Sequence, residues 1–312
     1  MDECFCGSTR GSSFEARETL FEREGVHKYQ ICSNCGSARL MESSPTVQDD
    51  LYGGEYGTLR ESGARTAVRC LANCLAYRSP RLGESIGTIL PFVNYGVLGV
   101  VRASQAGHKS RLLDVGCGAG RFLRSLRFAG FRGHCVGIDP FLCGDRLLAG
   151  GIQLIRGDIS DIHGRFDIIT IVHVLEHSDG PVRMLRLARE KLKDGGTIVV
   201  TIPLFGGTAW RRYGKDWVQL DAPRHAYLHT RTSLGIAASA AGLRIEQEIH
   251  DSTVFQFWGS DVVKRRGYLF PLQGADLSLL LRRLGSYLRD VAIAKREGLG
   301  DQSTFVLRAS LS

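Results

Sequence analysis

The sequence predicts an α/β protein in which a doubly wound parallel sheet follows a small β-rich module. Three observations lead to this fold class. From residue 111 onward, short Val- and Ile-rich runs alternate with amphipathic stretches, which is typical of strands that helices cover on both faces. Three alternating glycines directly follow the first of these runs. Four of the nine cysteines lie in the first 35 residues, as a C-x-C and a C-x-x-C pair.

Length and composition favour one large domain and one small one. The 312 residues are 43% hydrophobic and 23% charged, an ordinary globular composition. The net charge of +8 suits an anionic partner such as a phosphorylated substrate, a nucleic acid or a membrane surface. The sequence has no block of five or six consecutive Lys or Arg. Solubility is therefore the favoured interpretation of the charge, and a nucleic-acid partner is not favoured.

No stretch of the sequence predicts a secretion signal or a membrane span. The first residues lack the basic and apolar regions of a signal peptide. The longest apolar stretch, Ile86–Val101, is shorter than the roughly 20 residues that span a bilayer. We expect a buried helix–turn segment there, with peripheral membrane contact as the weaker alternative. The expected location is cytoplasmic, where cysteines stay reduced.

The part of the chain before the sheet is expected to have two sections. Residues 1–45 contain two strand-like runs, SFEARETLF and HKYQIC, and form the β-rich module. Residues 46–108 are a linker and a helical segment. The Gly- and Tyr-rich stretch 46–62 predicts a linker or an ordered lid, and the helical part has a break at Ser79-Pro80.

The N-terminal cysteines predict a structural zinc ribbon. Zinc prefers four tetrahedral thiolate or imidazole ligands, and disulfides are a poorer choice in a reducing compartment. The first pair is one residue shorter than usual, and the interval between the pairs exceeds the common spacing. The ribbon is expected to dock on the larger domain, with nucleic-acid binding as the alternative. The predicted ligands are Cys4, Cys6, Cys32 and Cys35.

Residues 109–312 are expected to form the sheet domain. The predicted strands are RLLDV, HCVGIDP, IQLIRGD, FDIITIVHV and TIVVTIPLF, and RFLRSLRFAG predicts a helix. A second helix, Pro181–Lys193, has Pro at its start and a Gly pair just after its end. Two further strands, at 244–250 and 303–311, flank a helical insertion over 256–298.

The glycine loop indicates a nucleoside cofactor at the carboxyl ends of the strands. Its spacing is G-x-G-x-G, and Arg121 stands where the dinucleotide fingerprint requires a third glycine. Asp139 ends the second strand, where a carboxylate can accept hydrogen bonds from both ribose hydroxyls, although NAD would fit this residue equally well. Asp158 ends the next strand. It either meets an adenine amino group or caps a helix.

These motifs resemble the class I S-adenosylmethionine (SAM)-dependent methyltransferases, over roughly residues 110–312. The resemblance rests on LLDVGCGAGRF, VGIDP, GDIS, FDIITIVHVLEH and LKDGGTIVVTIP. It implies a Rossmann-like sheet of seven strands with the last antiparallel, and SAM as cofactor. The predicted cofactor-binding residues are Asp114, Gly116, Cys117, Gly118, Gly120, Asp139, Pro140, Asp158, Ile159 and His173.

The stretch HVLEH, from His173 to His177, matches the inverted zinc-protease pattern H-x-x-E-H. That chemistry needs a sustained helix, whereas a predicted strand precedes this stretch and Ser178–Pro181 leaves room for barely one turn. We therefore expect it to line the methyl-transfer pocket. Glu176 and His177 are expected to be structural or to touch cofactor or acceptor.

The long segment 204–230, rich in Trp, Tyr, Arg and His, is either a functional loop or a lid packed on the sheet edge. With the ribbon and the motifs W-x-x-L-D-x-P-R-H and FQFWGS, it resembles bacterial methyltransferases of sugar, cell-surface-glycan and natural-product biosynthesis. This resemblance implies a small-molecule, sugar/glycan or lipid-linked acceptor. A hydroxyl acceptor needs a base, for which His225 is the first candidate and His177 the second. The alternative is a nucleic-acid methyltransferase or binding module led by the ribbon.

Overall fold

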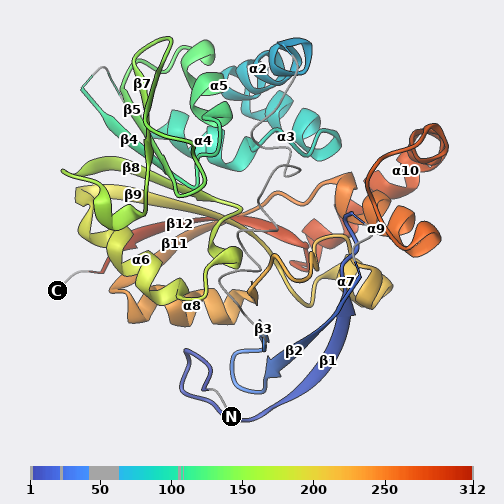
Figure 1. Ribbon diagram of the computed structural model, residues 1–312. Helices are drawn as coiled ribbons and strands as arrows, with labels where there is room; N and C mark the ends of the chain where they lie inside the picture. Colours follow the sequence, from blue (N-terminus) through green and yellow to red (C-terminus); the bar gives the residue numbers. More distant parts are fainter. Residues whose placement is uncertain (1–2, 22–23, 42–62, 105–106, 108, 311–312) are drawn as a thin grey trace.

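The computed structural model describes residues 3–21, 24–41, 63–104, 107 and 109–310. The predicted linker or lid over 46–62, and the predicted module boundary at residue 45, lie outside the described residues. Figure 1 shows a central twisted sheet with helices on both faces and the N-terminal strands at one end of the molecule. Within the described parts of the chain, no helix is both long and apolar enough to cross a membrane.

The central sheet has eight strands in the order β11-β12-β9-β8-β4-β5-β7-β6. β12 runs antiparallel between β9 and β11, and the pairs among β9, β8, β4, β5 and β7 are parallel. The predicted α/β class is confirmed, including the antiparallel last strand. The strands are β4 (Arg111–Val115), β5 (His134–Asp139), β6 (Arg146–Leu148), β7 (Ile152–Arg156), β8 (Phe166–Val172), β9 (Leu192–Pro203), β11 (Leu243–His250) and β12 (Gln302–Ala309).

The expected number of seven strands is corrected to eight, because β6 adds a short strand at the outer edge. The chain turns back there through Gly150 and Gly151, which have φ values of +80° and +73°. Two successive residues with positive φ suit a tight hairpin turn and favour glycine. Leu148 of β6 therefore pairs antiparallel with Ile152 of β7.

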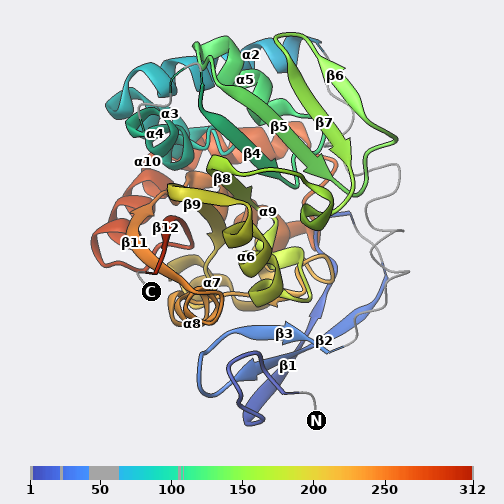
Figure 2. The ribbon, with the colours of Figure 1, turned by 90° about the vertical axis from the view of Figure 1, so that its left-hand side faces the viewer.

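Two helical layers cover the sheet (Figures 1 and 2). On one face lie α2 (Gly63–Arg78), α3 (Pro80–Ile89), α4 (Tyr95–Ala103) and α5 (Arg121–Ala129). On the other face lie α6 (Pro181–Glu190) and α8 (Arg231–Ala240). The predicted break at Ser79 is present, since this residue is extended and Pro80 begins α3. Buried side chains of α2 and α4 share a core with β4 and α5, so the chain on either side of the predicted boundary at 109 packs together.

The helix predicted over Pro181–Lys193 ends earlier, at Glu190. Leu192 already belongs to β9, is buried, and pairs with Phe166 of β8. The Phe166 amide donates to the Lys191 carbonyl at 2.8 Å. Sheet pairing of an apolar residue thus overrides the helical preference of the stretch after Glu190.

The insertion predicted over 256–298 is a pair of helices, α9 (Val254–Arg266) and α10 (Gly274–Arg296), between β11 and β12. Segment 204–230 contains the short helix α7 (Thr208–Tyr213) and packs its aromatic residues onto this pair. Trp217, for example, is completely buried in a core that also contains Phe257 of α9 and Tyr287 of α10.

The N-terminal module consists of β1 (Gly11–Arg17), β2 (Val26–Cys32) and β3 (Ala38–Leu40). A two-residue strand of the larger domain, β10 (Tyr227–Leu228), completes its sheet by pairing antiparallel with β3. Figure 2 shows this sheet next to α8. The module therefore shares both a sheet and a core with segment 204–230.

Candidate cofactor and acceptor site

A cavity of about 400 Å³ opens at the carboxyl ends of β4, β5 and β8. This size suits a small-molecule cofactor. Of the residues predicted from the sequence, eight line it: Gly116, Gly118, Asp139, Pro140, Asp158, Ile159, His173 and His177. Four do not line it: Asp114, Cys117, Gly120 and His225.

The glycine loop needs its glycines for conformation and for space. Gly116, Gly118 and Gly120 have φ values of +71°, +50° and +72°, which residues other than glycine rarely adopt. A Cβ at Gly116 would lie 2.3 Å from Val174 Cγ2. Cys117 instead points into the core, where a Cβ added at Gly137 would lie 2.6 Å from its Sγ atom. The loop thus presents bare backbone to the cavity.

Asp139 is held by two backbone amides of residues that line the cavity. Its Oδ2 accepts from the Gly118 amide at 2.8 Å, and its Oδ1 accepts from the Phe141 amide at 2.9 Å. A carboxylate has about four lone-pair positions, so each oxygen retains one for a ligand. This geometry suits the two hydroxyls of a ribose.

Asp158 caps a short helix, which is one of its two predicted roles. It accepts from the Ile159 amide at the start of the 3-10 helix Ile159–Asp161, and the Asp161 carboxylate accepts from the Asp158 amide at 2.8 Å. Asp158 also lines the cavity. Its capping role fixes the loop that borders the adenine end of the predicted cofactor site.

Asp114 lies beneath the glycine loop and is 4% exposed. Burial raises the pKa of its carboxyl to about 7, although the hydrogen bond from Thr170 Oγ1, at 2.7 Å, opposes the shift. The nearby charge of Asp139 raises this pKa further. Asp114 supports the loop from inside the sheet.

The HVLEH stretch forms a bend and a single 3-10 turn, Leu175–His177, after β8. It is not the sustained helix that the zinc-protease pattern requires. His173 Nδ1 lies 3.3 Å from Oε1 of Glu176, which is 1% exposed. Burial raises the pKa of Glu176, but the hydrogen bond with His173 and the nearby histidines lower it to about 2. Glu176 is therefore an ionised carboxylate behind the cavity wall.

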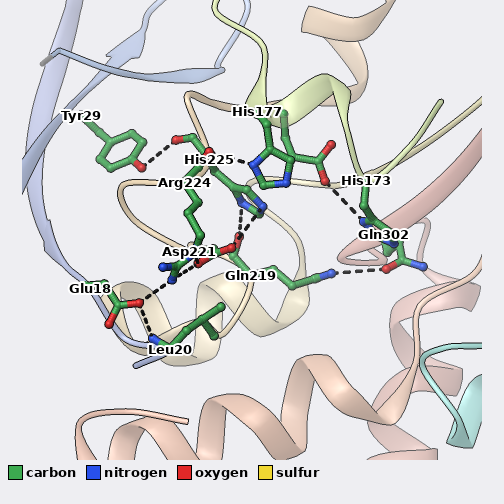
Figure 3. Close-up of polar contacts among 11 residues, drawn as sticks. Glu18, Leu20, Tyr29, His173, His177, Gln219, Asp221, Arg224, His225 and Gln302 are labelled. Atoms are coloured by element: carbon green, nitrogen blue, oxygen red, sulfur yellow. Dashed lines mark hydrogen bonds and ion pairs between the residues drawn. The ribbon is translucent and has the colours of Figure 1, made fainter. Parts of the chain in front are cut away.

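His177 and His225 lie in edge-to-face contact, with ring centroids 4.8 Å apart (Figure 3). His177 Nδ1 lies 2.8 Å from the Arg224 carbonyl, and His225 Nδ1 lies 2.9 Å from the Gln219 carbonyl. A carbonyl only accepts hydrogen bonds, so both Nδ1 atoms carry a proton. The ligand atoms of Glu176, His177 and His225 all lie within 4.8 Å of one another.

The two histidines differ in their access to the cavity. His177 lines it, whereas His225 is 6% exposed and lies behind His177. Burial lowers the pKa of His225 to about 4, so its imidazole is neutral near pH 7. Only His177 can meet a molecule bound in the cavity.

A buried polar cluster behind these histidines involves residues that the sequence analysis missed. Arg224, 1% exposed, donates to Asp221 and to Glu18 of the N-terminal module. The Tyr29 hydroxyl donates to the His225 carbonyl at 2.7 Å (Figure 3). Nothing local marks Glu18 or Tyr29 in the sequence, because their partners lie about two hundred positions away.

The four predicted zinc ligands lie together at the tip of the module, with their sulfur atoms all within 4.8 Å of one another. Cys4 Sγ is 3.7 Å from Cys35 Sγ, and Cys6 Sγ is 3.5 Å from Cys32 Sγ. The four thiols are not joined by disulfides. This cluster is compatible with a tetrahedral metal ion.

Comparison with known proteins links the middle part of the chain to methyltransferase domains. A family model described as a methyltransferase domain matches residues 97–248. Ubiquinone biosynthesis O-methyltransferase of Schizosaccharomyces pombe is 30% identical over 101 residues, covering 29% of this chain and 37% of that protein. tRNA U34 carboxymethyltransferase of Aeromonas salmonicida is 35% identical over 126 residues, covering 33% and 37%. The chain spans less than half the length of the curated relatives it matches.

Among solved structures, the [4+2]-cyclase SpnF is similar with a TM-score of 0.44 and 20% identity, over 70% of this chain and 82% of that one. CalO1, a methyltransferase of calicheamicin biosynthesis in its SAH-bound form, gives a TM-score of 0.38 and 20% identity, over 50% and 53%. The family match covers the strands and the glycine loop that build the cavity. These matches support a class I SAM-dependent methyltransferase domain over residues 97–248.

Proposed function

We propose that this protein transfers a methyl group from SAM to a hydroxyl of a small-molecule, sugar/glycan or lipid-linked acceptor. One observation carries the proposal. The bare backbone of the glycine loop, the Asp139 carboxylate and the His177 imidazole all line the same cavity. The first two suit a nucleoside cofactor, and the third supplies a base where an acceptor can enter.

The residues around the cavity fit SAM. The Gly116–Gly120 backbone accommodates the methionine end, Asp139 binds the ribose diol, and the turn from Asp158 to Ile159 borders the adenine. When bound, SAM supplies a methyl group already activated on a sulfonium, so orientation is the main task left to the protein.

We place His177 first as the general base, ahead of His225. The Arg224 carbonyl accepts a hydrogen bond from His177 Nδ1 and so orients a ring that lines the cavity. The ionised Glu176 nearby stabilises the imidazolium that forms. His225, the first candidate from the sequence, does not line the cavity. We assign it a positioning role against the His177 ring.

We propose a structural zinc ion at Cys4, Cys6, Cys32 and Cys35. With a zinc–sulfur distance of about 2.3 Å, tetrahedral geometry separates the sulfur atoms by about 3.8 Å. The distances of 3.7 and 3.5 Å are close to this value. A reduced thiol cluster suits a reducing compartment, which supports the expectation of a cytoplasmic location.

An RNA acceptor is the second candidate, because one relative is named a tRNA U34 carboxymethyltransferase. The two candidates separate in one experiment. The protein is incubated with isotopically labelled SAM and either the small-molecule or the RNA fraction of a cell extract, and labelled products are identified by mass spectrometry. We expect label in the small-molecule or lipid fraction. Label confined to RNA would replace the proposed acceptor class.

The role of His177 is tested in the same assay. His177→Gln is expected to lower kcat by about 10²–10⁴-fold while leaving the calorimetric Kd for SAM unchanged. Wild-type protein is the reference for both measurements. Full activity of His177→Gln would show that the acceptor needs no base from this residue.

A further inference from the structure

The α9–α10 helix pair carries a large share of the positive charge of the protein. Residues 254–296 contain eight Lys or Arg and three Asp, a net charge of +5 out of +8 for the whole chain. In Figure 1 these helices lie at the margin of the molecule, and the loop between them contacts the chain just after β1, where the Leu269 amide donates to the Thr19 carbonyl at 2.8 Å. More than half of the net positive charge of the chain thus falls on this helix pair.

All three acidic residues of the pair are already neutralised by partners. Asp261 binds Arg283, Asp276 binds Arg266, and Asp290 binds Arg212 of α7. Among the described residues, by contrast, no carboxylate pairs with Lys264, Arg265, Arg282 or Arg289. Four cations are thus available to an external anionic partner.

Three leucines lie exposed at the end of the pair where α9 turns into α10. Leu272, Leu277 and Leu281 are 47%, 56% and 69% exposed. Leu277 and Leu281 are four residues apart, so they lie on one side of α10. We call Lys264, Arg265, Leu272, Leu277, Leu281 and Arg282 the hairpin tip.

The hairpin tip is held rigidly in this arrangement. Arg266 donates to Asp276 at 2.5 Å and to the Pro271 carbonyl at 3.0 Å. The Trp258 indole donates to the Asp276 carbonyl at 2.9 Å. These bonds join the end of α9 to the start of α10, so the leucines stay outward rather than folding onto the protein.

From this combination we propose that the hairpin tip docks the protein on a membrane surface that carries anionic phospholipid headgroups. Cations next to exposed leucines match such a surface, because the headgroups attract the cations and the acyl boundary receives the leucines. Nucleic-acid phosphates would meet the cations but leave the leucines in water. A second copy of the chain would bring two tips of like charge together in a symmetric contact.

Vesicle cosedimentation tests the proposal with the full chain. We expect binding to vesicles of phosphatidylcholine mixed with phosphatidylglycerol, weaker binding as salt is raised, and little binding to phosphatidylcholine alone. No cofactor or acceptor is needed, so the result is independent of the proposed methyl transfer. Equal binding to both vesicle types, or no binding, would overturn the proposal.

Two variant pairs separate the parts of the surface. Leu277→Gln with Leu281→Gln keeps the charge, and Lys264→Gln with Arg282→Gln keeps the leucines. Each pair is expected to weaken binding by about tenfold or more. The matched control is Arg146→Gln with Leu147→Gln on β6, since Leu147 is 74% exposed at the opposite edge of the sheet. This control should bind like wild type, with thermal unfolding confirming that all variants are folded.

The proposal would be wrong if both variant pairs bound vesicles as wild type does. RNA binding that the same variants abolish would assign the surface to nucleic acid instead. A solution dimer that Leu277→Gln with Leu281→Gln dissociates would assign it to a second copy of the chain. The last two are measured by mobility shift and analytical ultracentrifugation.

Discussion

Two buried carboxylates near the cavity have pKa values shifted in opposite directions, because their partners differ. Asp114 and Glu176 are both buried. Asp114 receives a hydrogen bond from a neutral threonine, and burial raises its pKa to about 7. For Glu176, burial also raises the pKa, but the contact with His173 and the surrounding histidines lower it to about 2. Burial alone therefore does not determine the charge of this site, and the nearest partner does.

At Asp139, replacement by Ala removes the carboxylate that we propose binds the ribose. We expect the affinity for SAM to fall by about 1.5–3 kcal/mol, or about ten- to a hundredfold, as for a lost hydrogen bond to a charged group. Isothermal titration calorimetry measures the change. The Kd of Asp139→Asn for SAM should lie between those of wild type and Asp139→Ala, because Asn keeps one acceptor oxygen. As a control, replacement of the exposed Asp194 by Ala should leave the Kd unchanged. An unchanged Kd in Asp139→Ala would contradict the assigned cofactor pose.

His225 makes stability depend on pH. Its pKa is lowered by burial from 6.5 to about 4 in the folded protein. Between these values the unfolded chain binds a proton that the folded protein does not, so stability is fully present above pH 6.5 and falls as pH drops toward 4. The stability advantage of wild type over His225→Gln should shrink across this window, by at most about 1.4 kcal/mol per pH unit.

Urea unfolding at several pH values measures this effect. His229, whose pKa burial also lowers to about 4, provides a parallel case, so His229→Gln should show a similar slope. A difference in unfolding free energy that stays constant from pH 7 to pH 4 would show that His225 is not buried as a neutral ring.

Helices and strands with a regular hydrophobic pattern could be predicted from the sequence, whereas elements that form by pairing with a distant strand could not. The strands of the parallel sheet and the two helices between β11 and β12 follow from continuous apolar runs and helical patterns. The strand β10 could not be predicted, because two residues become a strand only through pairing with β3. The early end of α6 likewise depends on the contact of Leu192 with β8.

The site follows the same rule. The glycine loop, Asp139 and His173 were predictable, because each directly follows or ends a strand and the carboxyl ends of parallel strands meet at one edge. The burial of His225 was not predictable, since it comes from the packing of segment 204–230 between the module and α9–α10. The sequence named His225 and His177 as first and second candidates for the base. Their rings lie in contact, but of the two His177 lines the cavity and His225 does not.

Arg224 connects two elements that are far apart in sequence, and its removal is expected to be costly. Arg224→Met leaves the buried carboxylates of Glu18 and Asp221 without their cation. We expect a loss of about 3–5 kcal/mol in unfolding free energy, as for a broken buried ion pair. Adding Glu18→Gln should recover part of the loss, because one unpaired charge is removed. Strictly additive effects in this double-mutant cycle, measured by denaturant unfolding, would contradict direct pairing.

For the whole molecule, segment 204–230 joins three units into one. It contributes β10 to the module sheet, packs Trp217 against the α9–α10 pair, and carries the Arg224 carbonyl that orients His177. Among the residues that the structure describes, those lining the cavity lie between 115 and 184. Unfolding of the N-terminal module should therefore affect the residues that position His177 more than the residues proposed to bind the cofactor.

Removal of the proposed zinc ion tests this division. Structural zinc supplies much of the folding energy of small modules, so chelation, or Cys32→Ser with Cys35→Ser, should unfold the module. The pairing of β3 with β10 and the bond from Thr230 Oγ1 to the Cys35 carbonyl, at 2.6 Å, should be lost. Hydrogen exchange should accelerate at 38–40 and 227–228, while the amides of β4 and β5 stay protected and the Kd for SAM stays unchanged.

The control is Cys143→Ser, which replaces an exposed cysteine outside the cluster and should retain the metal. Elemental analysis should give one zinc per chain in wild type and none in the double variant, since four thiolates form one tetrahedral site. Methyl transfer should fall in the double variant. The Arg224 carbonyl binds His177 and the His225 carbonyl accepts from Tyr29, so unfolding of the module should displace both. Full methyl transfer by a zinc-free protein would show that the acceptor side is organised by the larger domain alone.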